Sequence, residues 1–408
     1  MDDNAYDILA QRGFVAQVTD DQALREAFQA GPVTFYVGFD STATSLHAGS
    51  LVPIMAMMHL QRAGHRPIGL VGGGTTMVGD PSGKTEMRQM LSEEKIRGYG
   101  DRIHAQLGRY LDFDGPAIPV NNADWLLALN YVPFLRDIGV HFSVNRMLAA
   151  EAYKQRLERG LSFIEFNYQL LQAYDYLTLY RKYGCTLQMG GDDQWGNILA
   201  GVDLIRRVEG TAVHALTFPL LTTASGAKMG KTASGAVWLD GDLLSPYEFY
   251  QYWINCDDRD VERFLKLFTL LPLDEIARLA VLQGAEIRSA KQVLAFEATR
   301  ISHGKQAAEE AQAASKAAFG SGGDIDAMPT TTVAAAQIEQ GIPLTTVLAN
   351  VGLTKSRGEA RRAIQQGGAY VNDVRVTEVQ YVLSADDLIE GGVTLRVGKK
   401  RYHRLVMD

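Results

Sequence analysis

Apolar and polar positions alternate in blocks along the first half of the chain, and the blocks predict strands and helices in turn. Residues 33–39 form an apolar run typical of a buried strand, and a turn over 40–45 follows it. Residues 47–63 predict a helix closed by Gly64, and residues 66–71 predict a second buried strand. Strand, helix and strand with glycines after the strands predict an α/β fold with a Rossmann-like parallel sheet, whose ligands bind at the carboxyl ends of the strands.

A second run of the same kind follows further along the chain. Residues 162–165 form a capping box that opens a long predicted helix, which ends near Gly184. Strands are predicted over 185–189 and 215–221, with a loop and a helix between them. Residues 1–240 therefore predict one Rossmann-like domain that contains a connective insertion.

Helical patterns dominate after this domain. Residues 245–248 combine an N-cap serine, a proline at the first helical position and a glutamate three residues after the serine, which is typical of a helix start. We therefore expect a separate α-helical domain over 241–319, and the glycines and threonines of 320–342 predict a linker. The remaining segment, 343–408, predicts a short helix over 357–366 followed by strands, and so a small α+β module.

Charge is distributed unevenly along the chain, although the net charge is only −7. Residues 343–408 carry ten basic and seven acidic side chains, a balance of +3 that leaves −10 for the rest of the chain. A basic tail on an acidic body favours local binding of a polyanion, and an ordinary solvated charged surface is the alternative. No apolar run approaches the ~20 residues of a membrane span. Because the acidic N-terminus also lacks a signal pattern, we expect a soluble cytoplasmic protein that does not bind a membrane.

Two short segments contain side chains suited to phosphate chemistry. His47 lies where a turn meets a predicted helix N-terminus, which is a natural phosphate site, and Gly49 allows a flat adenine to approach the backbone. Lys228 and Lys231 stand in a glycine-flanked loop, where two ammonium groups can follow a departing pyrophosphate. Thr232 can cap the next segment or hydrogen-bond a phosphate. The alternatives are a satisfied surface histidine and a solvated basic turn.

Polar side chains form a stripe on the helix opened by the capping box. Tyr168, Gln172 and Asp175 are spaced i, i+4 and i+7, and they therefore share one helix face. Neighbouring leucines favour a polar pocket over a wet surface, although a solvated face stays the alternative. Asp80, which follows a glycine-rich loop, can pair with an ammonium group or can simply stabilise a turn.

The segments 45–50 and 227–232 resemble the two signatures of class I aminoacyl-tRNA synthetases, in the order and at the separation typical of that class. Longer segments extend the resemblance to bacterial tyrosyl-tRNA synthetase over essentially the whole chain, namely 36–40, 70–73, 79–84, 139–145, 172–175 and 190–197. The chain departs from that family at Ser50, where a second histidine is usual, and at Ser41 and Thr44, where proline and aspartate are usual. A serine can still hydrogen-bond a ribose but cannot carry positive charge.

The resemblance implies a role for each matching position. It implies that Tyr36 and Asp175 bind the phenol of a tyrosine substrate, and it assigns the rest of the tyrosine pocket to Asp80, Tyr168, Gln172 and Gln194. Nucleotide contacts are implied at Gly38, Asp40, His47, Gly49, Ser50, Gly191, Asp193, Lys228 and Lys231. Catalytic positions are implied at Thr42, His47, Lys84, Arg88, Lys228, Lys231 and Thr232. Contacts with tRNA are expected at Lys355, Arg357, Arg361, Arg362, Lys399 and Lys400.

The activity implied by the resemblance is that of an ATP-dependent tyrosine–tRNA ligase, which forms tyrosyl-adenylate and pyrophosphate and then transfers tyrosyl to tRNA(Tyr). Mg²⁺ is expected with the ATP, although no carboxylate cluster resembles a dedicated metal site, and Cys185 and Cys256 permit no zinc finger. The family also implies a homodimer. One alternative is a catalytically weak relative that acts as an RNA-binding protein, which Ser50 favours. The other is an enzyme for tryptophan or another nucleotidyl transferase, against which the Tyr36–Asp175 pair argues.

Overall fold

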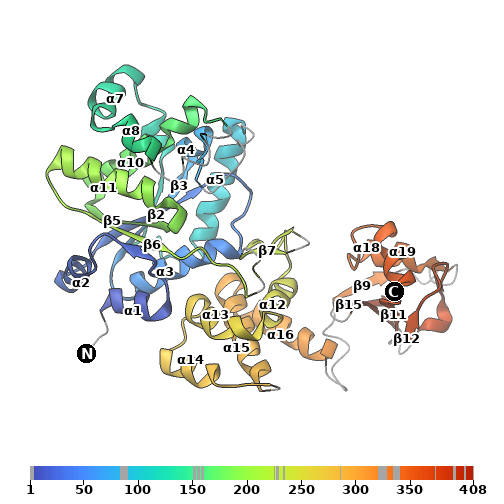
Figure 1. Cartoon of the computed structure of the whole chain (residues 1–408). Coiled ribbons are helices and arrows are strands. Elements are labelled where there is room, and N and C mark those ends of the chain that lie inside the picture. The colour runs from blue at the N-terminus through green and yellow to red at the C-terminus, as the bar shows by residue number, and fades with distance from the viewer. Residues whose placement is uncertain are drawn as a thin grey trace. The chain divides into compact units, whose positions relative to one another are not determined.

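The computed structural model describes the chain apart from residues 1–3, 83–90, 150–152, 154–156, 158–159, 225, 227–228, 233–234, 285, 320–328, 334–340, 373, 389–391, 399–400 and 408. The described chain divides into two compact units, Met1–Lys305 and Gln306–Asp408 (Figure 1). The domain boundaries expected after residues 240, 319 and 342 stay predictions. Among the described residues, no helix is long and apolar enough to cross a membrane.

The first unit is built on a six-stranded sheet with the order β1-β6-β5-β2-β3-β4. Every neighbouring pair is parallel except β1 with β6, which confirms the predicted Rossmann-like sheet. The strands are β1 Gln17–Val18, β2 Thr34–Asp40, β3 Arg66–Gly72, β4 Ile118–Asn121, β5 Cys185–Gly191 and β6 His214–Phe218. The last strand is shorter than the predicted 215–221, because Pro219 lacks the N–H group that a ladder requires.

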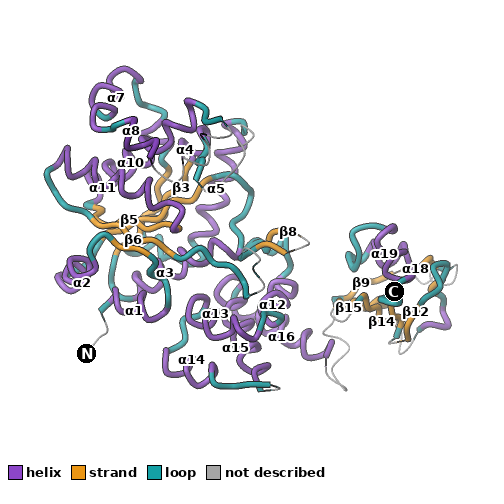
Figure 2. The backbone as a smooth tube through the Cα atoms, in the orientation of Figure 1, coloured by secondary structure: helices purple, strands orange, loops and turns teal. Residues whose placement is uncertain are grey.

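Helices cover the sheet of the first unit, as the tube view in Figure 2 shows. They are α1 Ala5–Arg12, α2 Asp21–Ala30, η1 Ala48–Ser50, α3 Leu51–Arg62, α4 Gly73–Val78, α5 Glu93–Leu107, α6 Ala123–Leu126, α7 Tyr131–Asp137, η2 Gly139–His141, α8 Val144–Ala149, α10 Phe163–Tyr183, η3 Asp192–Gln194 and α11 Trp195–Glu209. The helix predicted over 47–63 therefore begins as a short 3-10 turn that continues into α3.

Helix α10 carries the predicted polar stripe and forms as its sequence predicts. The Ser162 hydroxyl accepts from the backbone N–H of Glu165 at 3.3 Å, and the Glu165 carboxylate accepts from the backbone N–H of Ser162 at 3.2 Å, which completes the capping box. Gly184 ends the helix in the left-handed region with φ 64°. The other face of α10 buries Tyr176 and Leu177 in a core that includes Tyr36 of β2. This packing fixes α10 against a face of the sheet.

The helical part of the first unit contains η4 Asp258–Asp260 and the helices α12 Pro246–Ile254, α13 Val261–Phe268, α14 Leu273–Ala280 and α15 Ile287–His303, after a small hairpin of β7 Lys231–Thr232 and β8 Gly235–Ala236. Its core surrounds the buried Trp253 ring, whose centroid lies 5.9 Å from that of Phe264 and 4.8 Å from that of Phe268. Arg12 of α1 joins this part to the sheet part. Its guanidinium donates to three carbonyl oxygens at and after the end of α13, those of Lys266, Thr269 and Leu271.

The second unit packs the helices α18 Leu344–Asn350 and α19 Arg357–Gln365 on one face of a five-stranded sheet. The order of its strands is β12-β11-β14-β15-β9. Its elements are α16 Lys305–Phe319, β9 Thr330–Val333, β10 Ile342–Pro343, α18 Leu344–Asn350, α19 Arg357–Gln365, β11 Ala369–Val371, β12 Val374–Val376, β13 Val382–Leu383, η6 Ala385–Asp387, β14 Gly392–Val397 and β15 Arg401–Met407. Leu348 and Ile364 of the two helices meet Val371 and Leu395 of the sheet in one core. The unit therefore has a hydrophobic core of its own.

Candidate active site

A cavity of about 240 Å³ opens at the carboxyl ends of β2 and β5. Eleven of the predicted site residues line it, namely Tyr36, Gly38, Asp40, Ser50, Asp80, Tyr168, Gln172, Asp175, Gly191, Asp193 and Gln194. They come from the neighbouring parallel strands β2 and β5, one face of α10, the turns η1 and η3, and the loop that follows α4. Because the carboxyl ends of parallel strands meet at one edge of the sheet, residues far apart in the sequence gather there.

Asp175 lies at the closed end of the polar stripe and is 2 % exposed. Its Oδ2 accepts from Nδ2 of Asn122 at 2.9 Å, and its Oδ1 accepts from Nε1 of Trp125 at 2.7 Å. Burial raises the pKa of this carboxyl to about 7, while the Asn122 and Trp125 hydrogen bonds hold it lower than burial alone would. Both of these side chains are donors, so they favour an ionised carboxylate that has acceptor capacity left for a ligand.

Tyr36 is the second buried polar group in the cavity wall. Its side chain is 1 % exposed, and its hydroxyl has no hydrogen-bond partner within the described part of the chain. Burial, followed by the nearby charge of Asp175, raises the pKa of this phenol well above its ordinary value, so the hydroxyl keeps its proton. A buried hydroxyl without a partner is destabilising unless a ligand satisfies it. The Tyr36 hydroxyl and the Asp175 carboxylate together therefore indicate a site for a polar group such as a phenol.

The opposite side of the cavity carries a second group of polar contacts. Nε2 of Gln194 donates to Asp80 at 2.6 Å, and the other carboxylate oxygen of Asp80 accepts from the backbone N–H of Ser82 at 2.9 Å. Asn197 donates to the Gln194 side-chain oxygen at 3.2 Å and so orients the amide. Burial, and then the charge of Asp80, raises the pKa of the Asp193 carboxyl. Two carboxylates close together suit a cationic group of a ligand.

The structure brings the two signature segments into direct contact. Nδ1 of His47 accepts from the backbone N–H of Gly49 at 3.0 Å. Gly230 adopts φ +77°, and a Cβ atom there would lie 2.6 Å from the backbone N of Gly49, so only glycine fits. After the second signature the chain pairs with the first one, because the N–H of Ala48 donates to the carbonyl of Val237 at 2.7 Å. The backbones of the two signature segments thus lie against each other.

Other predicted residues lie elsewhere or outside the described residues. Thr42 follows β2, where its N–H donates to the carbonyl of Asp40, but it does not line the cavity. Lys231 and Thr232 form β7, for which only the backbone is described. The positions outside the described residues are Lys84, Arg88, Lys228, Lys399 and Lys400. Exposed side chains on α19 and just before it include Lys355, Arg357, Arg361 and Arg362.

Asn122 and Trp125 are site residues that the sequence did not predict. Besides contacting Asp175, the Asn122 side chain donates to the Thr75 hydroxyl at 3.0 Å and accepts from the N–H of Gly74 at 2.7 Å. Asn122 follows β4, which is one more parallel strand ending at the same edge of the sheet. Recognising residues 118–121 as a strand would have pointed to this asparagine, since polar residues after parallel strands line ligand sites.

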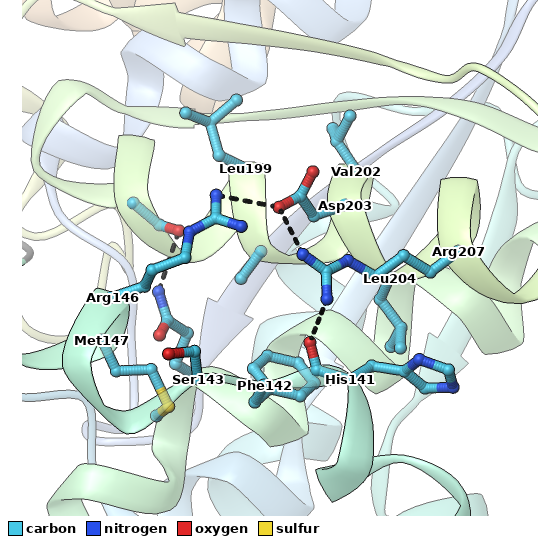
Figure 3. A pocket seen from close by; sticks show the side chains of 13 residues that line it. His141, Phe142, Ser143, Arg146, Met147, Leu199, Val202, Asp203, Leu204 and Arg207 are labelled. Carbon is cyan, nitrogen blue, oxygen red and sulfur yellow. Dashed lines mark hydrogen bonds and ion pairs between the residues drawn. The ribbon is translucent and has the colours of Figure 1, made fainter.

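A second cavity of about 310 Å³ lies between α8 and α11 (Figure 3). Asp203 in its wall is already paired, because it accepts from Arg146 at 3.1 Å and from Arg206 at 3.0 Å. Burial raises the pKa of this carboxyl, but the Arg206 hydrogen bond and the charge of Arg146 outweigh that effect, and the net pKa is lowered. The ionised carboxylate is therefore stabilised. No predicted site residue lines this cavity. The 240 Å³ cavity is therefore the better candidate for the active site.

Comparison with known families assigns both units. The family described as "tRNA synthetases class I (W and Y)" matches residues 29–320, and the "Tyrosine--tRNA ligase SYY-like C-terminal domain" matches residues 323–405. The first match covers well over half of the chain and includes the parallel sheet and the cavity. Fold and site thus define a class I tRNA synthetase.

Individual relatives narrow the class. The chain is 56% identical to a tyrosine–tRNA ligase of Desulfosudis oleivorans over 98% of both chains, and 53% identical to one of Clostridium tetani over the whole of both. The chain belongs to the tyrosine–tRNA ligase family, which supports the ligase over the RNA-binding alternative. Among solved structures, a C-terminally truncated mitochondrial tyrosyl-tRNA synthetase of Aspergillus nidulans is 32% identical. The two structures superpose with a TM-score of 0.69, and the match covers 76% of this chain and 92% of the Aspergillus nidulans chain.

Proposed function

We propose that this ATP-dependent ligase activates tyrosine in the 240 Å³ cavity and transfers it to tRNA(Tyr). One observation carries the choice of substrate, which is that the buried Tyr36 hydroxyl and the buried Asp175 carboxylate line the same cavity. A tyrosine phenol can donate to Asp175 and accept from Tyr36. Phenylalanine would leave both groups buried without their ligand partner, and this loss disfavours it.

The amino-acid backbone of the substrate is proposed to lie toward Asp80. The carboxylate of Asp80, together with Tyr168 and Gln172 of α10, lines the cavity and is assigned to the α-ammonium group. Gln194, which already donates to Asp80, is assigned to the neighbouring carboxylate and ribose. Gly38 and Gly191 allow the nucleotide to approach the backbone, and Asp193 and Ser50 are assigned to its sugar side.

The first chemical step is proposed to proceed by positioning and charge stabilisation. A tyrosine carboxylate oxygen forms a bond to the α-phosphorus of ATP, and the bond to the leaving pyrophosphate breaks. Nδ1 of His47 accepts from the backbone N–H of Gly49, which orients the ring, and His47 is assigned to the phosphate. Lys228, Lys231 and Thr42 are assigned to the same phosphates. In the second step a terminal ribose hydroxyl of tRNA attacks the adenylate carbonyl and AMP leaves, so neither step requires a protein nucleophile.

The ion that accompanies ATP is proposed to be Mg²⁺. Within the described chain, no group of three histidine, cysteine, aspartate or glutamate side chains is arranged to hold a metal ion. The phosphates of ATP and water can supply the oxygen ligands that Mg²⁺ prefers.

We also propose a cytoplasmic homodimer. Large apolar side chains that remain exposed are concentrated in one segment of the first unit, namely Leu127, Tyr131, Val132, Leu135, Val140, Val144, Leu157, Phe163 and Ile164. Exposed apolar surface of this kind typically marks a protein–protein interface. Sedimentation equilibrium of the full chain measures the assembly state, and a monomer at micromolar concentration would contradict the proposal.

The second unit is proposed to bind tRNA. Arg357, Arg361 and Arg362 are exposed on α19 and can contact phosphates. On the sheet, the guanidinium of Arg396 lies 3.5 Å from the ring centre of Tyr370, and Arg375 donates to the Tyr370 hydroxyl at 3.1 Å. Stacked guanidinium and aromatic groups are features of nucleic-acid-binding surfaces.

Tyrosine-dependent exchange of labelled pyrophosphate into ATP tests the proposed activity directly. The full chain should catalyse this exchange with tyrosine and not with phenylalanine or tryptophan at equal concentration. Exchange that is absent with tyrosine, while tRNA binding is retained, would instead support a catalytically weak RNA-binding protein. Exchange with tryptophan would contradict the assignment of Tyr36 and Asp175.

Replacing Lys228 or Lys231 by alanine is expected to slow adenylate formation while tyrosine affinity stays nearly unchanged. The ammonium charges matter most as pyrophosphate separates, so their loss should raise the barrier of the chemical step by about 2 kcal/mol or more. Pre-steady-state fluorescence separates tyrosine binding from the activation rate. A variant that lost tyrosine affinity but kept its activation rate constant would contradict this role.

Tyrosine binding is expected to weaken as the pH falls below about 7. The raised pKa of Asp175, about 7, means that this carboxyl is increasingly protonated below that pH, and a protonated carboxyl is a poorer acceptor for the phenol. Affinity should therefore fall toward about tenfold per pH unit on the acidic side and level off above the pKa. Equilibrium titrations from pH 5.5 to pH 8.5, roughly spanning the titration of this group, provide the measurement. Tyr36→Phe should keep this dependence and Asp175→Asn should lose it, whereas equal profiles for both would point to another titrating group.

A further inference from the structure

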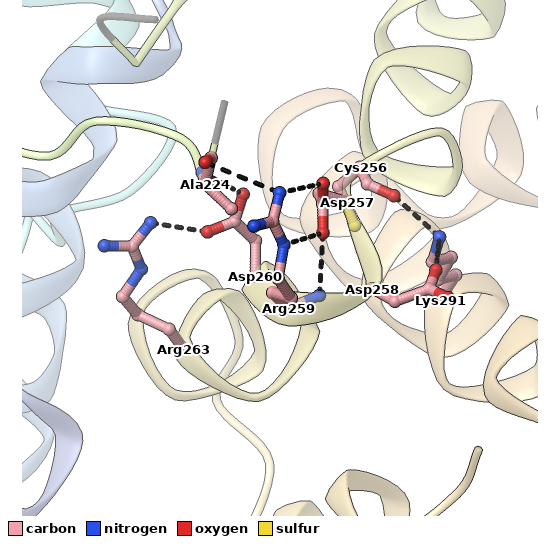
Figure 4. A network of polar contacts seen from close by, with 8 residues as sticks. All are labelled: Ala224, Cys256, Asp257, Asp258, Arg259, Asp260, Arg263 and Lys291. Carbon is pink, nitrogen blue, oxygen red and sulfur yellow. Dashed lines mark hydrogen bonds and ion pairs between the residues drawn. The ribbon is translucent and has the colours of Figure 1, made fainter. Parts of the chain in front are cut away.

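A pair of charged side chains from the helical part of the first unit holds the segment that enters the second signature loop (Figure 4). Oδ2 of Asp260 accepts from the backbone N–H of Ala224 at 2.8 Å. Oδ1 of Asp260 accepts from Nη2 of Arg263 at 2.6 Å, and the same nitrogen donates to the carbonyl oxygen of Thr222 at 2.6 Å. One acid–base pair therefore fixes two backbone groups at the loop entry.

Asp260 uses its side chain for this contact and not for a cap of its own helix. Asp260 is the N-cap residue of α13, and it is 2 % exposed. An aspartate at an N-cap normally accepts from N–H groups of its own helix. Here the side chain makes no capping hydrogen bond and instead reaches a backbone group 36 residues earlier in the chain. The turn η4 that leads into α13 is capped by Asp257, whose carboxylate accepts from the backbone N–H of Arg259 at 3.0 Å, so the Asp260 carboxylate serves the loop entry.

The far end of the same loop is anchored independently. The N–H of Met229 donates to the carbonyl of Leu221 at 3.0 Å and closes the base of the loop. The N–H of Gly230 approaches the Tyr252 hydroxyl at 3.4 Å, and Gly230 packs against Gly49 of the first signature. In the sequence, Lys228 stands between the anchored entry and this anchored end. The Asp260–Arg263 pair is therefore the fixed point on one side of the lysine.

We propose that Asp260 and Arg263 are positioning residues for the phosphate end of adenylate formation. They hold the backbone at Thr222 and Ala224, and they thereby fix the point from which the second signature segment begins. Neither residue lines the substrate cavity, so both act through the loop backbone. The proposal rests on the proposed ligase function. Preorganised charge contributes to the rate only when it is held in place before the reaction, which gives this anchor a kinetic consequence.

The experiment compares Asp260→Ala, Arg263→Ala and Arg263→Lys with the wild-type chain. Because a charge-assisted hydrogen bond is removed, Asp260→Ala should reduce adenylate formation at subsaturating ATP by about 10- to 100-fold. Arg263→Ala should act in the same direction, with a smaller effect since Asp260 still binds Ala224. Arg263→Lys should recover part of the loss, because an ammonium group can reach the same two oxygens. Tyrosine affinity should stay within about twofold in all three variants.

A matched control comes from an acid–arginine pair in the same helical part. Asp274 and Arg278 pair at 2.9 Å on α14 with both side chains exposed, so Asp274→Ala should leave ATP dependence unchanged. The proposal would be overturned if Asp260→Ala and Arg263→Ala kept the ATP dependence of the wild-type chain. It would also be overturned if tyrosine affinity fell by the same factor as adenylate formation. If Asp260→Ala fails to fold, the two Arg263 variants decide, since that side chain is 42% exposed. Failure of the ligase function itself would appear as absent exchange in the wild-type and control proteins.

Discussion

Replacing Asp175 by alanine is expected to reduce tyrosine activation by roughly 100-fold or more, because it removes a charged acceptor from a fully buried phenol site. The fold should tolerate the change. The raised pKa of Asp175, about 7, shows that burying its ionised form is unfavourable in the empty protein, and its removal offsets the missing acceptor for Asn122 and Trp125. Pyrophosphate exchange and thermal melting, measured on one preparation, test both parts. Near-normal exchange at saturating tyrosine would contradict the assignment of Asp175 to tyrosine binding.

Tyr36→Phe is the matched variant for this experiment. It deletes only a hydroxyl that has no partner within the described residues, so the empty protein should melt at the same temperature or slightly higher. Tyrosine affinity should nevertheless fall by about tenfold, since the variant cannot form a hydrogen bond to the ligand. An unchanged or higher melting temperature together with a lower tyrosine affinity would show that the hydroxyl serves ligand binding and not the fold. A lower melting temperature with unchanged affinity would mean that the hydroxyl has a structural role.

Removing residues 320–408 is expected to leave tyrosyl-adenylate synthesis largely intact and to abolish, or severely weaken, transfer to tRNA. The cavity and both signature segments belong to the first unit, and the second unit has a separate hydrophobic core. Adenylate formation and tRNA charging should be compared in the full-length and truncated enzymes. A truncated enzyme that charged tRNA at the full rate would show that the second unit is dispensable.

A full-length variant distinguishes weaker tRNA binding from a disrupted fold. Changing Arg357, Arg361 and Arg362 to glutamine removes three exposed charges from α19 without deleting its core residues Ala360 and Ile364. For every phosphate that is no longer bound, the dependence of log affinity on log salt concentration should decrease by about one unit. Unchanged salt dependence would place the tRNA-binding site on another surface, such as the sheet surface that carries Tyr370 and Arg396.

Local signals in the sequence were sufficient for the elements around the site. The capping box at Ser162 and Glu165, and the left-handed glycine at 184, mark the two ends of α10 because caps depend on neighbouring residues alone. The strand from Thr34 to Asp40 was visible for a similar reason, since a parallel strand buried on both faces is a continuous apolar run. Strand β4 was not predicted because it is short and contains Pro119, which makes its pattern weak.

The sequence by itself determined the parallel sheet, the family and the residues of the polar stripe, because periodicity, caps and signature segments are local properties of the chain. Only the tertiary structure showed that Asn122 and Trp125 donate to Asp175, that Gly230 packs on Gly49, and that the carboxylate of Asp260 anchors the loop at Ala224. These contacts join segments that are far apart in the sequence. Their polar groups are satisfied only after the sheet edge and the helices have been brought together, and no periodicity in the chain encodes that pairing.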